Sequence, residues 1–124
     1  MLNLKRKKLL SGSQGEEAAA RYLERKGYKI IEQNYRACGS EIDLIAQYGD
    51  TLCFIEVKTR KTDDFGLPAE FVDFRKRKKI IRGARVFTGR KKYAEMYVRF
   101  DIVAVIYEGR APVINHIENA FEEE

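Results

Sequence analysis

Three carboxylates and one amine are spaced so that a single β-hairpin would gather them on one face. Glu41 and Asp43 precede a turn at residues 49–50, and Glu56 and Lys58 follow it. The turn reads Gly-Asp between runs rich in β-branched and aromatic residues, which favours a two-residue type I′ or II′ connection. Carboxylates gathered in this way bind hard divalent cations, which activate water and stabilise charge on a phosphate. The spacing therefore predicts a metal-dependent site for phosphodiester hydrolysis.

The turn also fixes which residues face one another, with Asp43 opposite Glu56 and Glu41 opposite Lys58. Directly opposed side chains share a face, with Cβ atoms about 4.5–5.5 Å apart, whereas a slip of one residue would separate the two sets of charges. We expect Asp43 and Glu56 to bind the metal, with the carbonyl of Val57 completing the shell. Lys58 would orient the attacking water or offset charge on the phosphate. Glu41 either binds a second ion or pairs with Lys58.

A structural interpretation competes with the metal site. A salt bridge between Glu41 and Lys58 on a half-exposed sheet would leave Asp43 and Glu56 solvated. Two carboxylates directly opposite each other argue against it, since like charges in that position destabilise a sheet.

The other face of the hairpin is apolar and suits a core. It carries Ile42, Leu44, Ala46, Cys53, Ile55 and Val57. Nearer the turn, Ile45, Leu52 and Phe54 lie on the charged face, which indicates that this side is also partly covered. Charges in a partly buried sheet are costly unless they are paired or metal-bound.

The rest of the chain supplies elements that would hold the hairpin in a sheet. Ser13 and Glu16 form a capping box for a first helix that ends at Gly27. We then expect strands at 28–35 and on both sides of the turn, a loop at 61–68, a helix at 70–87, a buried strand at 99–107 and an edge strand at 113–118. Because a helical crossover joins parallel strands, strand 99–107 should lie beside the second hairpin strand.

This order, α-β-β-β-α-β-β, predicts an α/β fold in which helices flank a mixed β-sheet. We expect a single domain at 13–120, preceded by a basic flexible arm at 1–12 and followed by an acidic tail at 121–124. The arm serves either as a binding element or as a solubilising tail.

The charge balance favours a polyanionic partner. Lys and Arg outnumber Asp and Glu by 24 to 19 among 124 residues. The expected contacts with a phosphate backbone are Arg60, Arg75, Lys76, Arg77, Lys78, Lys79 and Arg82. A solvated helix face is the alternative interpretation of the cations in the second helix.

Several function classes fit the sequence poorly. Cys38 and Cys53 are too few for a disulfide framework and suit a reducing cytosol. No apolar segment resembles a signal peptide or a membrane span, so we expect a cytoplasmic protein without membrane contact. His116 is the only histidine, which disfavours zinc hydrolases and His-based catalysis. We expect it on the surface of the edge strand.

The chain resembles the YraN-like family of bacterial proteins, which is similar to archaeal Holliday junction resolvases and to the PD-(D/E)XK nuclease superfamily. The likeness covers nearly all of the chain after residue 12. The matching positions are Gly15-Glu16, Ala19, Tyr22-Leu23, Gly27-Tyr28, Asn34-Tyr35-Arg36, Glu41 to Ala46, Phe54 to Arg60, Gly66, Pro68 and Arg99-Phe100-Asp101.

The resemblance implies a restriction-endonuclease-like fold, with Asp43, Glu56 and Lys58 as catalytic residues. It also implies that Glu16 contacts the metal, with the capping box as the alternative role. Ile42 stands where the superfamily often has proline. Asp101 matches a family position, and a carboxylate at the start of a buried strand can satisfy local backbone groups.

We therefore expect a Mg²⁺- or Mn²⁺-dependent endonuclease acting on branched or structured DNA. The resemblance implies a homodimer, because a four-way junction needs two cuts. A nuclease acting on RNA or on free ends would use the same residues. The main alternative is a non-catalytic nucleic-acid-binding or DNA-processing partner protein that retains the fold.

Overall fold

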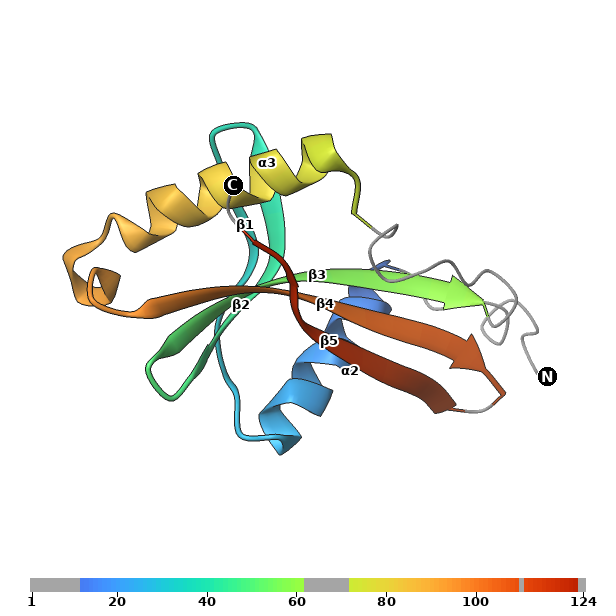
Figure 1. Cartoon of the computed structure of the whole chain (residues 1–124). Coiled ribbons are helices and arrows are strands. Elements are labelled where there is room, and N and C mark those ends of the chain that lie inside the picture. Colours follow the sequence, from blue (N-terminus) through green and yellow to red (C-terminus); the bar gives the residue numbers. More distant parts are fainter. Residues whose placement is uncertain (1–11, 62–71, 110, 123–124) are drawn as a thin grey trace.

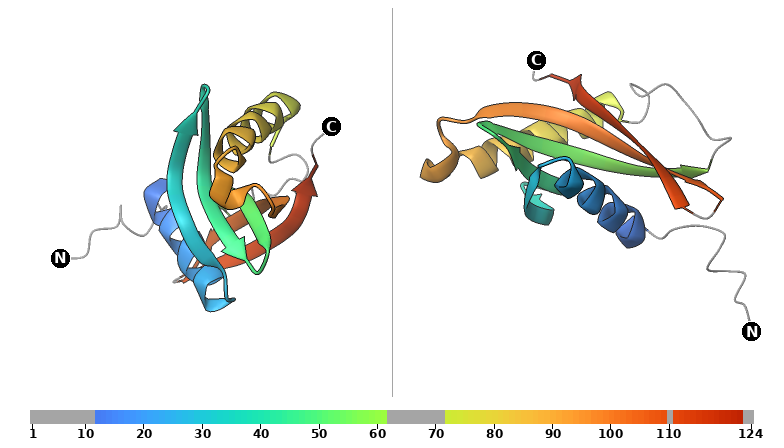
Figure 2. Two further views of the ribbon diagram at one scale, coloured as in Figure 1. Left: turned by 90° about the vertical axis from the view of Figure 1, so that its left-hand side faces the viewer. Right: turned by 90° about the horizontal axis from the view of Figure 1, so that it is seen from below.

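The computed structural model describes residues 12–61, 72–109 and 111–122 and consists of one sheet with a helix on each face. The helices are α2 (Gly12–Arg25) and α3 (Phe74–Thr88), and a short 3₁₀ helix, η2 (Lys91–Tyr93), follows α3. The strands are β1 (Lys29–Ala37), β2 (Ser40–Tyr48), β3 (Thr51–Lys61), β4 (Tyr97–Glu108) and β5 (Ala111–Phe121). Figure 1 has α3 above the sheet and α2 below it, and in the right-hand view of Figure 2 α2 lies in front.

The sheet is mixed, as predicted. Its strand order is β1-β2-β3-β4-β5, and every neighbouring pair is antiparallel except β3 and β4, which are parallel. The parallel pair follows from α3, which carries the chain across one face of the sheet between these strands. This confirms the α/β class, the element order and the placement of the fourth strand beside the third.

The hairpin of β2 and β3 has the predicted register. Tyr48 pairs with Thr51, and the pairing continues in step as far as Leu44 and Ile55. Beyond that point a side chain bridges the two strands, because Oδ2 of Asp43 accepts the backbone N–H of Val57 at 2.8 Å. Figure 1 shows β2 rising away from β3, while the C-terminal half of β3 runs on beside β4. The two strands therefore separate where the predicted acids lie.

Two apolar clusters fill the space between the sheet and its helices. On the α2 side, Leu44, Ala46, Cys53 and Ile55 pack against residues such as Leu23. The α3 side is larger and contains Ile42, Ile45, Leu52, Phe54, Ile80 and Phe87.

Ile42 lies on the opposite side from the one we predicted. It packs in the α3 cluster, whereas Leu44 packs in the α2 cluster. Strict alternation would place both residues on one face, so the change of face falls at Asp43, where the regular pairing of β2 with β3 ends. A Cβ on Gly83 of α3 would come within 3.2 Å of Cδ1 of Ile42, which shows how closely helix and strand approach there.

Some element boundaries differ from expectation. Ser13 lies within α2 rather than before it. Helix α3 starts at Phe74, after Asp73, whose Oδ1 accepts the N–H of Lys76 at 2.9 Å. Of the predicted arm at 1–12, residues 1–11 lie outside the described residues and Gly12 begins α2. The predicted loop at 61–68 also lies outside them, except for Lys61, which ends β3.

The last strand is longer than the predicted 113–118. It continues to Phe121, which stacks on Phe100 with ring centroids 5.2 Å apart and is buried. The segment expected to be an acidic tail therefore begins with a core residue.

Candidate functional site

Asp43 and Glu56 meet where β2 and β3 separate. The pKa of Asp43 is raised to about 7, first by burial and then by the nearby charge of Glu56, while the hydrogen bond from Val57 acts in the opposite direction. A hydrogen bond between the two carboxyl groups also favours the protonated form of Asp43. Two carboxylates this close disfavour each other's ionisation unless a cation lies between them. The adjacency predicted from the hairpin register is thus present.

Glu56 is the most enclosed of the predicted site residues, with 3% of its side chain exposed. Its Oε2 atom forms ion pairs with Lys58, at 3.3 Å, and with Lys76. Its Oε1 atom is buried and has no hydrogen-bond partner within the described part of the chain. A buried carboxylate oxygen without a donor is costly, so Glu56 has unused capacity to bind a cation.

Lys76 reaches this site from α3, which the sequence did not reveal. Burial by itself would lower the pKa of Lys76, but the hydrogen bond and charge of Glu56 outweigh it and raise that pKa above its usual value. We expected Lys76 only as a contact for a phosphate backbone. Its position depends on how α3 docks on the sheet, which the local sequence pattern does not specify.

Glu16 approaches the same acids from α2. Burial raises the pKa of Glu16, a hydrogen bond with Asn34 opposes the rise, and the charges of Glu41 and Glu56 add to it. The adjacent Gly15 makes the approach possible, because a Cβ there would overlap Oγ1 of Thr59 on β3. Glu16 therefore faces the acidic site rather than serving only the helix terminus.

Glu41 has a different partner from the one we predicted. Its Oε2 pairs with Nε of Arg36, across β1 and β2, at 3.3 Å. Lys58 pairs with Glu56 instead. The predicted pairing of Glu41 with Lys58 is wrong because the regular β2–β3 pairing ends before it reaches them.

A divalent cation fits the pair of acids better than it fits a larger cage. Among the described residues, no group of three or more His, Cys, Asp or Glu side chains is arranged to hold one metal ion. Mg²⁺ commonly uses one or two carboxylates and keeps several waters. Asp43 and Glu56 match that requirement, and the unpaired Oε1 of Glu56 supplies an available ligand atom.

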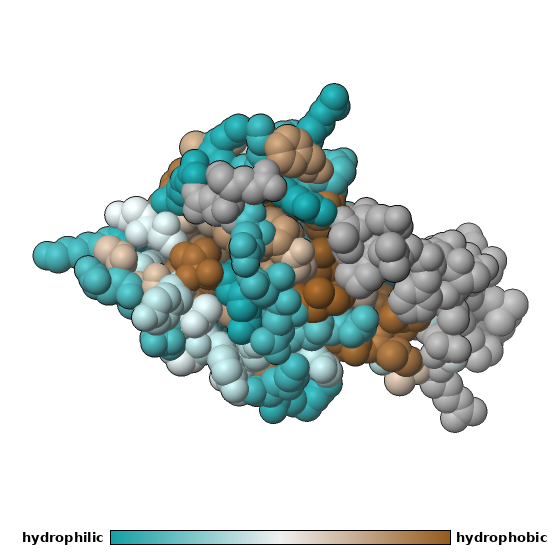
Figure 3. Space-filling view, viewed as in Figure 1, coloured by the Kyte–Doolittle hydropathy of each residue, from teal (hydrophilic) through white to brown (hydrophobic). Residues whose placement is uncertain are grey.

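The cations predicted to bind phosphate do not form one uniform face. Arg75, Lys78, Lys79 and Arg82 are exposed on α3, whereas Lys76 and Arg77 are half-buried. Arg60 lies near the end of β3, where its guanidinium donates to the carbonyl of Thr59 at 2.9 Å. Figure 3 shows hydrophilic side chains gathered over α3.

A second buried charged cluster is centred on Asp101, and the sequence pointed to this carboxylate but not to the partners that surround it. The Asp101 side chain is fully buried and binds Arg99 through two contacts of 2.8 and 2.9 Å, and it accepts the N–H of Asn119 at 3.0 Å. Burial would raise the pKa of Asp101, but the hydrogen bonds from His116 and Arg99 hold it below its usual value. The same arginine donates to the hydroxyl of Tyr28 at 2.6 Å.

His116 belongs to this cluster, so its predicted place on the surface is wrong. Its side chain is 2% exposed, and its Nε2 lies 2.7 Å from Oδ2 of Asp101. The signal in the sequence was two charged residues, Arg99 and Asp101, inside an otherwise apolar strand. The cluster joins β4 to β5 and to the residue before β1, which indicates a structural role.

The mixed sheet, the helix on each face and the acids at the separating strands define a nuclease-like α/β fold. A family model described as "Uncharacterised protein family UPF0102" matches residues 15–105. The chain belongs to this family, which confirms the resemblance found in the sequence.

Curated relatives extend the match over most of the chain. A UPF0102 protein of Caldanaerobacter subterraneus subsp. tengcongensis is 46% identical over 113 residues, covering 89% of this chain and 93% of the relative. One from Prosthecochloris aestuarii is 48% identical over 116 residues, covering 89% and 91%. Another, from Geobacter sulfurreducens, is 45% identical over 112 residues, covering 90% and 88%.

Within the described ranges, no helix combines the length and the apolar character that crossing a membrane requires.

Proposed function

We propose that this protein is a metal-dependent endonuclease that hydrolyses DNA phosphodiester bonds. The observation that carries the proposal is the buried pair Asp43 and Glu56 beside Lys58, with one oxygen of Glu56 unsatisfied among the described residues. Two neighbouring carboxyl groups disfavour each other's ionisation, whereas with a divalent cation between them they are a suitable ligand set for Mg²⁺ or Mn²⁺. We further propose that the protein acts in the cytoplasm.

In the proposed hydrolysis, the two acids and Lys58 would have different roles. Asp43 and Glu56 would hold the ion, and the hydrogen bond from Val57 to Asp43 fixes the orientation of that carboxylate. A divalent ion bound there lowers the pKa of water and offsets the charge that develops on the phosphate. Lys58, whose ammonium lies 3.3 Å from Glu56, would orient the water or donate to a phosphate oxygen.

Secondary roles fall to residues around the pair. Glu16 adds negative potential from α2 and is our candidate for a ligand reached through water. Glu41, paired with Arg36 at the surface, is a candidate for a second ion only if that ion pair opens. The exposed cations Arg75, Lys78, Lys79 and Arg82, with Arg60 and Arg77, would contact the phosphate backbone.

Branched or structured DNA is the proposed substrate and a homodimer the proposed active form, both on the strength of the family resemblance. A panel of labelled four-way, flap, nicked, linear and RNA substrates would test the substrate class with wild type and Glu56→Gln. We expect cutting of branched DNA by the wild type only. Preferential cutting of RNA or of free ends would show that branched DNA is not the substrate.

A non-catalytic DNA-binding function is the second candidate, and one observation favours it. Lys58 and Lys76 both pair with Oε2 of Glu56, so this carboxylate is already partly neutralised by the protein itself. Binding of DNA that does not respond to Mg²⁺, Mn²⁺ or Asp43→Ala, with no cutting of any substrate, would support this candidate.

A further inference from the structure

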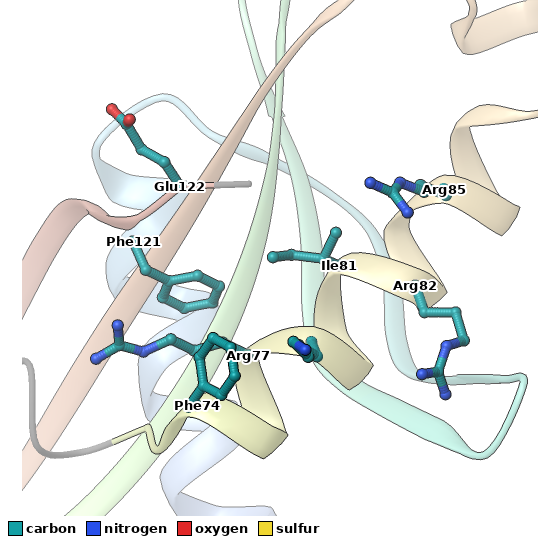
Figure 4. A pocket seen from close by; sticks show the side chains of 8 residues that line it. Phe74, Arg77, Ile81, Arg82, Arg85, Phe121 and Glu122 are labelled. Atoms are coloured by element: carbon teal, nitrogen blue, oxygen red, sulfur yellow. The ribbon is translucent and has the colours of Figure 1, made fainter. Parts of the chain in front are cut away.

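Helix α3 and the end of β5 enclose a hollow of about 470 Å³ that the proposed catalytic residues do not use (Figure 4). Lys76 points from α3 to Glu56, whereas the neighbouring residues Lys78 and Arg82 line this hollow. The acidic site and the hollow therefore lie against adjacent faces of α3. A volume of this size lies within the range of pockets for small ligands and admits a single nucleotide.

The hollow combines apolar surfaces with an excess of positive charge. Phe74, Ile81 and Phe121 supply the apolar part, and Figure 4 shows the rings of Phe74 and Phe121 close together at one end. The charged lining has four cations, Arg77, Lys78, Arg82 and Arg85, and one carboxylate, Glu122. This composition suits a ligand that has both a flat apolar part and negative charge.

Phe74 is the most informative of these residues, because 54% of it is exposed at the start of α3, whereas Ile80, Ile81 and Phe87 of the same helix are buried. The ammonium of Lys78 lies 4.5 Å from the centre of its ring. An exposed aromatic ring beside cations is typical of proteins that bind single strands, where bases stack on rings and Lys or Arg contacts phosphates.

We propose that this hollow binds an unpaired nucleotide of a single-stranded DNA segment. The base would pack against Phe74 and the apolar surface, and Arg82 and Arg85 would contact the flanking phosphates. This inference rests on the proposed nuclease function and narrows its substrate class to DNA with unpaired residues close to the cleavage site. Because Lys76 on the same helix reaches Glu56, a strand bound along α3 leads toward the acids.

An acidic peptide is the competing occupant, since it would also satisfy the cations. A nucleotide is favoured because it offers a flat aromatic surface to Phe74 together with phosphate charge, whereas acidic side chains leave the ring without a stacking partner. The two ligands also differ in a measurable way, since the fluorescence of the base analogue 2-aminopurine changes on stacking, whereas carboxylate side chains give no such signal.

The test uses the full-length protein in a chelating buffer, so that neither metal nor cleavage enters the result. The probes are an oligothymidylate carrying one 2-aminopurine and the same sequence as a duplex. We expect Phe74→Ala to weaken single-strand binding about 5- to 100-fold, as loss of one stacked base predicts, and to abolish the change in 2-aminopurine fluorescence. Phe74→Tyr should retain both, and duplex binding by Phe74→Ala should stay within about 2-fold of wild type.

Tyr97→Ala is the matched control, since Tyr97 is 70% exposed but lies on β4 outside the hollow. Wild-type behaviour of Tyr97→Ala together with the loss in Phe74→Ala would support the proposal. Unchanged single-strand affinity in Phe74→Ala would overturn it, as would an equal loss for duplex, or displacement of the oligonucleotide by polyglutamate at equal concentration. Because no divalent ion is present, these outcomes can be read whether or not the protein cuts DNA.

Discussion

The ammonium group of Lys76, on α3, lies against Oε2 of Glu56, a buried carboxylate in the middle of β3. A residue of the cationic helix thus enters the acidic site and pairs with a proposed metal ligand. Lys58 contacts the same oxygen from β3 itself. The protein therefore carries its own counter-ions where we propose that a divalent cation binds, and any such cation must compete with them.

Removal of Lys76 should strengthen metal binding. In Lys76→Gln, one positive charge beside Glu56 is lost, so we expect Mn²⁺ affinity measured by calorimetry to rise about 5-fold, close to 1 kcal/mol for a half-exposed ion pair. Lys79→Gln, an exposed change on the same helix, should leave the affinity unaltered. Weaker Mn²⁺ binding in Lys76→Gln than in Lys79→Gln would show that Lys76 supports the metal rather than competing with it.

The metal-free protein should lose stability as pH rises toward neutrality. The pKa of Asp43 is about 7 in the fold against 3.8 ordinarily, so the folded state holds a proton that the unfolded chain releases. The associated stability is complete below about pH 4 and declines until about pH 7, by about 2–4 kcal/mol. Urea unfolding in chelating buffer should show this decline in wild type and a flatter profile in Asp43→Asn. Equal profiles for the two proteins would refute the raised pKa.

Gly15 should be required for close packing of α2 on β3. In Gly15→Ala the new Cβ overlaps Oγ1 of Thr59, and we expect a loss of about 1–2 kcal/mol in the free energy of unfolding. Thr59→Ala removes the obstructing atoms and should restore most of the loss in the double variant. If the losses of unfolding free energy in Gly15→Ala and Thr59→Ala simply add in the double variant, residues 15 and 59 are not in contact.

Asp101 should stabilise the fold without contributing to metal binding. Asp101→Asn leaves Arg99 poorly compensated in a buried position, which should cost about 3–5 kcal/mol in unfolding free energy. Glu118→Gln provides the comparison, because Glu118 is 54% exposed and pairs with the same arginine at 3.3 Å. That change should cost less than about 1 kcal/mol. Similar losses of unfolding free energy in the two variants would show that Asp101 is not the main partner that stabilises Arg99.

The sequence predicted those parts of the site that depend on local pairing. A two-residue turn fixes the register of β2 on β3, and that register brings Asp43 beside Glu56. The strand order followed from the same reasoning, since a helical crossover requires parallel neighbours.

The parts that escaped prediction depend on docking and on breaks in regular pairing. Lys76 reaches Glu56 because of how α3 lies on the sheet, which periodicity does not determine. Ile42 changes face where pairing ends at Asp43, and alternation cannot anticipate such a break. His116 on β5 is buried because it contacts Asp101 on the neighbouring strand β4, a carboxylate that lies far from it in the sequence.

Metal binding by the two acids is the central claim, and calorimetric titration of Mn²⁺ into wild type and into the folded double variant Asp43→Asn, Glu56→Gln tests it most directly. We expect a saturable isotherm for wild type and none for the variant, with circular dichroism confirming that both are folded. Equal Mn²⁺ binding by the two proteins would contradict the site, and so would absence of binding in both, which would leave Glu56 paired only with Lys58 and Lys76.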